Sequence, residues 1–235
     1  MEEFTSQELF RKPPTGLEDY FERMRPIVDN TILKLSKAKF REDPIAGRKY
    51  SRATSIVSSA YKRHGTLLVQ ALLERLRDCA HLRVWTEDDF KLSHESLEKT
   101  RVVERIEALV NTHLPYGDRQ RSIRVDMFVL DEHRNSLNAY SIKRGNGSYD
   151  GGKRRSILTE LIRTQMLLKS YANSLDIDPV CVNAHIIFYY GVMSLTPPFA
   201  IDGGDLDKHF SFPVREAIEL VNDYFATMLR NLIEE

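Results

Sequence analysis

The chain has 235 residues, of which 42% are hydrophobic and 29% charged, a composition that is ordinary for a globular protein and argues against intrinsic disorder. Thirty-four lysines and arginines balance 34 aspartates and glutamates, so the zero net charge excludes a globally basic nucleic-acid binder but allows a local basic patch. The apolar run Ile186 to Met193 is too short to cross a bilayer, and the acidic first residues lack the apolar core of a secretory signal.

The first part of the chain indicates helices. Apolar spacing predicts a helix over residues 17–40, with Pro26 as a break or kink. A loop is expected at Asp43 to Gly47, where aspartate, proline and glycine cluster. A long helix follows from about Ile56 to Leu76, and Gly65 weakens its middle.

After this helix the pattern changes. Leu82 to Trp85 suggests a short strand, which we expect to end at a charged loop. Residues 96–111 have helical spacing, and their inward-facing residues would be Val102, Val103, Ile106, Leu109 and Val110. Proline and glycine between His113 and Arg121 then predict a turn.

Residues 122–143 predict a β-hairpin. The segment Ser122 to Leu130 is rich in β-branched residues, the polar turn Asp131 to Asn135 follows, and Leu137 to Lys143 forms the second strand. A glycine-rich loop over residues 145–152 then leads into a helix from about Lys153 to Ser174.

The last part predicts a buried strand, Cys181 to Tyr190, a loop containing Pro197-Pro198 and Gly203-Gly204, and a closing amphipathic helix, Val214 to Ile233. The order of elements predicts an α/β (α+β layered) fold, in which helices flank a mixed central sheet. We expect residues 1–50 to form a helical N-terminal segment, and residues 51–235 to form one domain.

Strand alternation brings a carboxylate and an ammonium group together. Arg124, Asp126 and Phe128 would share one face of the first strand, opposite a second set formed by Ile123, Val125 and Val129. Ser141 and Lys143 share a face of the second strand, so Asp126 would meet Lys143 if the two faces coincide. A carboxylate binds a hard divalent ion, and an adjacent ammonium orients or activates water. This combination suits hydrolysis of a phosphodiester.

The order of elements, with Arg124-Val125-Asp126 on one strand and Ser141-Ile142-Lys143 on the next, resembles the PD-(D/E)XK nuclease superfamily, which includes type II restriction endonucleases. In that family an aspartate ends or bends one strand, and an acid-x-Lys triplet lies on the next. The resemblance covers residues 52–192 in architecture but only a few residues in motif. It implies a restriction endonuclease-like core within residues 51–235 and a Mg²⁺-dependent DNA endonuclease, with Mn²⁺ as a substitute. A homodimer and a restriction or defence role follow by analogy.

Ser141 departs from the family pattern, because that position usually carries a second carboxylate. Some similar restriction endonucleases have Ser-x-Lys and take the missing glutamate from the following helix, which implies Glu160 here, with Asp150 as the alternative. Glu74, on the long helix, resembles the accessory acid that many members place near the metal. The resemblance thus implies catalytic roles for Asp126, Lys143 and Glu160, with Ser141 as a neutral filler, and a metal site formed by Asp126, Glu160 and Glu74.

The region around the glycine-rich loop is basic. Residues 140–163 contain six lysines and arginines against two acids, beside a loop and a helix N-terminus whose backbone N–H groups can bind phosphate. The loop matches neither common nucleotide-binding motif. We therefore expect this region to hold a DNA backbone, and its candidate contacts are Arg144, Lys153, Arg154, Arg155 and Arg163.

Simpler interpretations remain open. Arg124 is a plain partner for Asp126, and Arg163 is one for Glu160. A nucleic-acid-binding module that has lost catalysis, and a protein–protein interaction domain with a merely solvated basic loop, are the competing functions. His185 is expected to be a core histidine, and Tyr189-Tyr190 part of the core rather than a base-stacking surface. The two cysteines are far apart in the chain and lack Cys-x-x-Cys spacing, so we expect no disulfide framework or structural zinc, and a cytoplasmic location.

Overall fold

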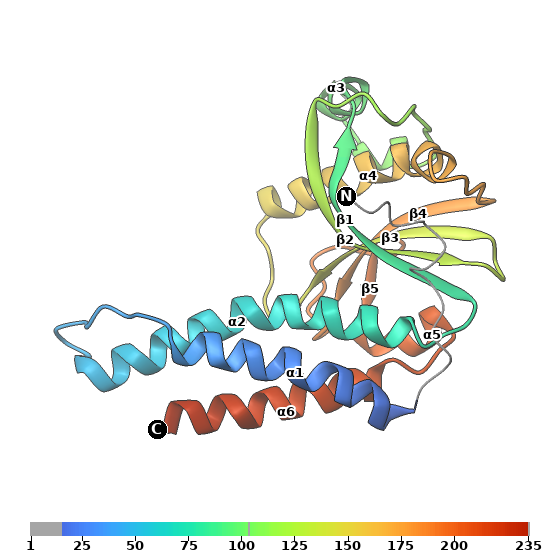
Figure 1. The fold of residues 1–235 in the computed structure, drawn as a ribbon. Coiled ribbons are helices and arrows are strands. Elements are labelled where there is room, and N and C mark those ends of the chain that lie inside the picture. The colour runs from blue at the N-terminus through green and yellow to red at the C-terminus, as the bar shows by residue number, and fades with distance from the viewer. Residues whose placement is uncertain (1–15, 103, 235) are drawn as a thin grey trace, which may run out of the picture.

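The computed structural model of the protein describes residues 16–102 and 104–234. It has three layers: a group of long helices, a five-stranded mixed sheet, and a further long helix on the other face of the sheet (Figure 1). The predicted layered α/β fold is therefore confirmed. Among the described helices, none is both long enough and apolar enough to span a membrane.

The helical layer consists of α1 (Leu17–Ser36), α2 (Gly47–Leu76) and α6 (Arg215–Glu234), which lie side by side under the sheet (Figure 1). Helix α1 continues through Pro26, because its neighbours Met24 and Val28 are fully buried and packing offsets the missing N–H. The boundary expected at residue 50 falls inside α2. Residues of α1 share one apolar cluster with α2, α6 and the lower face of the sheet.

The sheet has the strand order β1-β2-β3-β4-β5. Its strands are β1 (Leu82–Leu92), β2 (Arg121–Asp131), β3 (Ser136–Lys143), β4 (Cys181–Phe188) and β5 (Ala200–Asp202). β1, β2 and β3 pair antiparallel, whereas β3, β4 and β5 pair parallel. The predicted hairpin and the buried strand are present. Strand β5 was not expected, because three residues between prolines and glycines are too few to show alternation.

Helix α4 (Gly151–Asn173) covers the upper face of the sheet. It buries Ile157, Leu161 and Met166 against Phe128 and Ile186 in a second apolar cluster. The remaining elements are short: α3 (His94–Val102), η1 (Ile106–Leu109), η2 (Gly203–Asp205) and α5 (Leu206–Phe210).

Two local predictions on the first half of the chain are wrong. The charged loop expected after Trp85 is a continuation of β1, because β1 is an edge strand and an edge tolerates charged side chains. The single helix expected over residues 96–111 is divided into α3 and η1. Val102, expected to face inward, is 76% exposed, and Val103 lies outside the described residues.

Candidate active site

Strand β2 contains one extra residue at Asp126. Val125 pairs with Glu87 and Phe128 pairs with Trp85, so three steps along β2 match two along β1. Such a bulge interrupts alternation and re-aims the side chains beside it. The face assignment from simple alternation is therefore wrong for Ile123 and Val125, which pack in the same cluster as Phe128 and not with Val129.

The β2–β3 pairing stops next to this bulge. Backbone pairing runs only as far as Met127 and Tyr140. Beyond that point the Asp126 carboxylate takes over as an acceptor: its Oδ2 accepts the N–H of Ile142 at 2.8 Å and the hydroxyl of Ser141 at 3.3 Å. Asp126 thus holds together the fork where the two strands diverge, through a hydrogen bond strengthened by its charge.

Lys143 ends β3 beside this carboxylate. Its Nζ lies 3.7 Å from Asp126 Oδ2, so the structure brings together the pair that alternation predicts. Arg124 Nε lies 4.0 Å from Asp126 Oδ1 and 3.3 Å from Asp88 Oδ1. The plain ion pair with Arg124 therefore coexists with the Lys143 contact. The contact of Asp88 with Arg124 could not be predicted from the sequence, because the irregular pairing of β1 that produces it leaves no periodic pattern.

A cleft of about 160 Å³ opens between the fork and α4. Arg124, Ser141 and Lys143 line it from the strands, and Lys153 and Glu160 line it from α4. Its inner wall is apolar and includes Ile157, Leu161 and Ala184. The cleft therefore offers cationic groups around a site that is partly shielded from water, where electrostatic interactions are stronger than in bulk solvent.

Glu160 lies at the wall of this cleft but has its own partner. Its Oε1 accepts from Arg121 Nη2 at 3.2 Å, and the side chain is 43% exposed. The expected partner, Arg163, instead donates its Nε to Thr100 Oγ1 at 2.7 Å, and burial lowers the pKa of Arg163. The two candidate metal ligands thus have different cationic partners, Arg121 for Glu160 and Lys143 and Arg124 for Asp126.

Asp150, the alternative second carboxylate, caps helix α4. Its Oδ1 accepts the backbone N–H of Lys153 at 2.8 Å, which satisfies a free donor at the start of the helix. This carboxylate also occupies the helix N-terminus that was expected to receive phosphate. The candidate backbone contacts for a phosphate are therefore those of the glycine-rich loop.

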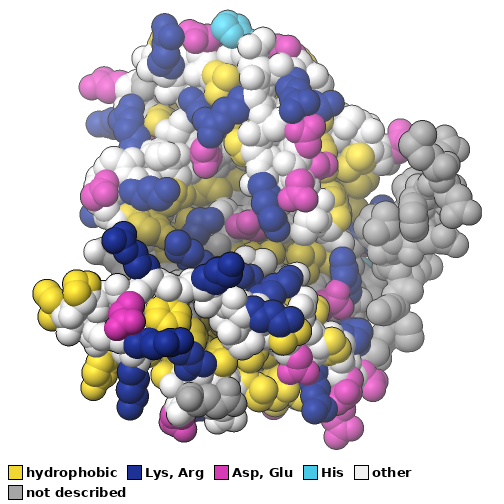
Figure 2. Space-filling view, turned by 60° about the vertical axis from the view of Figure 1, so that its left-hand side comes forward, with side chains coloured by type: hydrophobic (Ala, Val, Ile, Leu, Met, Phe, Trp, Pro, Cys, Tyr) yellow, Lys and Arg dark blue, Asp and Glu magenta, His cyan; other side chains and the backbone are white. Residues whose placement is uncertain are grey.

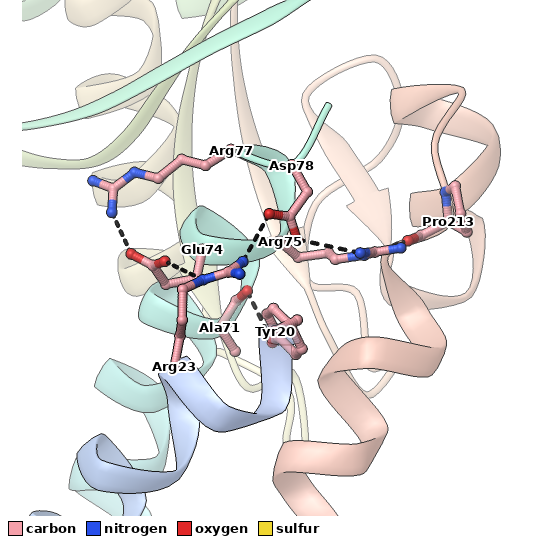
Figure 3. A network of polar contacts seen from close by, with 8 residues as sticks. All are labelled: Tyr20, Arg23, Ala71, Glu74, Arg75, Arg77, Asp78 and Pro213. Atoms are coloured by element: carbon pink, nitrogen blue, oxygen red, sulfur yellow. Dashed lines mark hydrogen bonds and ion pairs between the residues drawn. The ribbon is translucent and has the colours of Figure 1, made fainter. Parts of the chain in front are cut away.

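Glu74 lies in a polar network at the C-terminal end of α2 (Figure 3). It forms ion pairs with Arg23 and Arg77, and Arg23 also contacts Asp78 at 2.7 Å. Glu74 is nine residues beyond Gly65, the last α2 residue that lines a pocket near Lys143, or about 14 Å along the helix. The partners of Glu74 among the described residues are thus Arg23 and Arg77, and no contact of Asp126 involves α2.

The carboxylates near the fork fit a magnesium ion only in part. Among the described residues there is no group of three or more His, Cys, Asp or Glu side chains arranged to hold a metal. Mg²⁺ in phosphoryl-transfer sites is commonly held by one or two carboxylates, with water and substrate phosphate as the other ligands. Asp126 Oδ1 accepts no hydrogen bond from the described residues and fits as one ligand, with Glu160 as the second candidate.

Basic side chains surround the cleft and a neighbouring pocket. The pocket, of about 360 Å³, lies between α2 and the glycine-rich loop and shares Lys143 with the cleft. Figure 2 shows lysine and arginine side chains around a hollow between the helical layer and the rest of the molecule. The residues lining the two cavities include four cations, Arg124, Lys143, Arg144 and Lys153, and one acid, Glu160.

The other predicted DNA contacts differ in their surroundings. Arg154 donates its Nε to the carbonyl oxygen of Tyr149 at 2.9 Å and so braces the loop, whereas Arg155 is exposed near the start of α4. Arg163 packs toward α3 through Thr100. Lys153 and Arg144 are therefore the two predicted contacts that line a cavity.

A pair of histidines lies away from the fork, between β4 and α5. His209 Nε2 is 2.8 Å from the hydroxyl of Tyr140, and His185 Nδ1 is 2.9 Å from the carbonyl oxygen of Pro198. Burial, with smaller contributions from His185 and Arg134, lowers the pKa of His209 to about 4. Burial also lowers the pKa of His185, although this residue is only half-buried and not in the core, where it was expected. Both rings are therefore neutral at physiological pH.

The low pKa of His209 predicts a loss of stability in acid. The unfolded chain, with an ordinary histidine pKa of 6.5, takes up a proton before the folded protein does. The contribution of neutral His209 to the free energy of unfolding is fully present above pH 6.5. It is lost as the pH falls toward 4, by up to about 3 kcal/mol. We expect His209→Gln to flatten the dependence of Tm on pH in this range. The variant His94→Gln, at an exposed position, is the control for the loss of one histidine, and equal slopes for all three proteins would contradict the assignment.

The structure thus brings Asp126, Ser141 and Lys143 together beside a basic cleft, which Ser141, Lys143 and Glu160 line and Asp126 does not. Asp150 is engaged in capping α4, and Glu74 belongs to a separate network. Comparison of the chain with protein-family models, with curated proteins and with solved structures finds no match.

Proposed function

We propose that the protein is a Mg²⁺-dependent endonuclease that hydrolyses phosphodiester bonds of DNA at the Asp126–Lys143 fork. One observation carries this proposal: a carboxylate fixed by a backbone N–H lies 3.7 Å from an ammonium group that lines a cleft rich in cations. The pair is partly open to solvent, because the side chains of Asp126 and Lys143 are 20% and 37% exposed. The resemblance to PD-(D/E)XK nucleases assigns such a pair to phosphodiester hydrolysis.

The side chains have distinct roles in the proposed reaction. Asp126 is held in place by Ile142 and Ser141, so its Oδ1 is oriented without a further ordering cost. Lys143 would orient the attacking water and stabilise the negative charge that develops on the phosphate. Arg124 and Lys153 line the same cleft and would hold the phosphate. Bound Mg²⁺ would polarise a phosphoryl oxygen, with Asp126 and Glu160 as its protein ligands.

The proposed oligomeric state and biological role follow from the resemblance to the same nuclease superfamily. Cutting both strands of a duplex generally requires two sites, so a homodimer is part of the proposal, as is a restriction or other defence role in the cytoplasm. Incubation with plasmid and phage DNA in Mg²⁺ and in EDTA tests the activity directly. Metal-dependent cleavage supports the proposal, and intact DNA with every substrate contradicts it.

Lys143→Met should separate cleavage from binding. Because the ammonium would act on the reacting phosphate, we expect the cleavage rate to fall at least about 100-fold. Affinity for DNA in EDTA should fall less than tenfold, since the other cations of the cleft remain. Lys208→Met is the matched control, because Lys208 is exposed on α5 and lines neither cavity. If the two variants cleave DNA equally well, Lys143 has no catalytic role.

The ion pair between Glu160 and Arg121 favours a second candidate, a nucleic-acid-binding module that does not cleave. In that protein the basic cleft would hold the DNA backbone without a complete metal site. Its signature is binding that weakens steeply as salt rises, with no cleavage in Mg²⁺. Absence of DNA binding even at low salt would instead favour a protein–protein interaction domain.

A further inference from the structure

The pocket next to the cleft combines groups that recognise a nucleotide. It lies between Tyr61 and Gly65 of α2 and the segment Ile142–Tyr149, and its volume of about 360 Å³ is within the range of small-molecule sites. Its charged lining residues, Lys143 and Arg144, are both cations. Because Lys143 also lines the cleft, a strand whose phosphate lies at the fork can place an adjacent nucleotide in this pocket.

Arg144 forms an aromatic and cationic wall with two tyrosines. Its guanidinium carbon lies 4.6 Å from the centre of the Tyr61 ring and 5.6 Å from that of Tyr190. The Nε of Arg144 is buried and finds no hydrogen-bond partner among the described residues. Tyr61 lines the pocket and remains 53% exposed, so the part of its ring that Arg144 does not cover is open to a ligand, whereas Tyr190 stacks on His64 behind Arg144. The expectation that Tyr189-Tyr190 is core is met by Tyr189, which is 5% exposed, and not by Tyr190.

The loop supplies free backbone donors from a fixed position. Within the described part of the chain, the N–H groups of Asn146, Gly147 and Ser148 donate to no acceptor. The carbonyl oxygens of Arg144 and Gly145, however, accept from the backbone N–H groups of Tyr190 and Val192. A Cβ at Gly145 would lie 2.8 Å from that of Phe188, so the loop is packed closely on β4. These three residues are exposed and line the pocket, so their N–H groups can donate to a phosphate or to the edge of a base there.

We propose that this pocket binds an unstacked nucleobase of the DNA strand whose phosphate lies at the fork. The inference rests on the proposed nuclease function and extends it to the class of substrate. In a fully paired duplex the faces of the bases are covered by their neighbours, so Tyr61 can stack only on a base that is single-stranded or has been turned out of the helix. The protein would therefore prefer DNA with an unpaired nucleotide beside the scissile phosphate.

Binding in EDTA tests the pocket without any cleavage. Three labelled DNAs of one length are compared: a single strand, a duplex with one extra unpaired nucleotide, and a fully paired duplex. Tyr61→Ala should weaken binding of the single strand, of the interrupted duplex, or of both, by roughly 5- to 150-fold, and leave the paired duplex within twofold. Weakened binding of the interrupted duplex alone would show that the pocket takes a base turned out of a helix. Weakened binding of the single strand alone would show that it takes a base of an open strand.

Two further variants make the test specific. Tyr61→Phe keeps the ring and should bind as the native protein does. Tyr50→Ala is the matched control, because Tyr50 is a 67% exposed tyrosine on the same helix, outside the pocket. If Tyr61→Ala and Tyr50→Ala bind all three DNAs alike, the pocket does not hold a base. That result overturns this inference alone, because Asp126-dependent cleavage is measured separately. If Tyr61→Ala weakens binding but the native protein cleaves no DNA, only the proposed nuclease function is rejected.

Discussion

Asp126→Asn is expected to lower Mg²⁺-dependent cleavage by roughly 10²- to 10⁴-fold while leaving the protein folded. The asparagine carbonyl can still accept the N–H of Ile142, so the fork between β2 and β3 stays closed. What is lost is the negative charge that would bind the metal. Cleavage of plasmid DNA, thermal unfolding and binding of DNA in EDTA are the three measurements, and only the first should change strongly.

Asp126→Ala provides the comparison. Alanine removes the acceptor and leaves the Ile142 N–H unpaired, which costs about 1–3 kcal/mol of stability in addition to the loss of cleavage. Two variants that are equally inactive but differ in Tm would therefore separate the chemical role of the charge from the structural role of the oxygen. Undiminished cleavage in the asparagine variant would remove Asp126 from the active site.

Asp78→Ala is expected to give the largest loss of stability. The Asp78 side chain is 1% exposed and accepts from Arg23 at 2.7 Å and from Arg75 at 3.2 Å (Figure 3). Arg75, 9% exposed, also donates to the carbonyl oxygen of Pro213 and so ties α2 to the segment before α6. Removing the carboxylate takes a buried acidic partner from both arginines, at a cost of about 3–5 kcal/mol. Tm should fall by about 6–20 °C.

Glu74→Gln is the matched control in the same network. Glu74 is 19% exposed and its partner Arg77 42% exposed, so its ion pairs are partly solvated and the loss should be about 1 kcal/mol or less. The same variant tests the accessory metal role implied by the family resemblance, because cleavage should be unaffected. Equal losses of Tm for the two variants would contradict the importance of burial, and loss of cleavage in Glu74→Gln would restore its metal role.

The sequence predicts those parts of the structure that depend on short-range periodicity. The hairpin follows from alternation and from a polar turn of fixed length, and alternation also predicts the approach of Lys143 to Asp126. The bulge at Asp126 is invisible to the same reasoning, because an extra residue shifts only the partners and not the composition. Here the re-aimed carboxylate still reached Lys143, although Ile123 and Val125 changed face.

Partners that are distant in the sequence explain why the observed contacts of Glu160 and Glu74 differ from the predicted ones. Glu160 has Arg163 as a neighbour on its own helix, yet its partner is Arg121, which is 39 residues earlier. Glu74 resembles an accessory acid because of its place on the long helix, but Arg23, on α1, draws it into a different network. Charge pairs of this kind are set by the packing of helices against one another, which a local pattern cannot report.

The hydrogen bond from Ile142 to position 126 requires an oxygen and not a charge. Aspartate and asparagine codons differ by a single base, so one point mutation would convert a DNA-cleaving protein of this fold into one that only holds DNA, with the sheet intact. The reverse change is equally short. The boundary between enzyme and binding protein would then be crossed in evolution without passing through an unfolded intermediate.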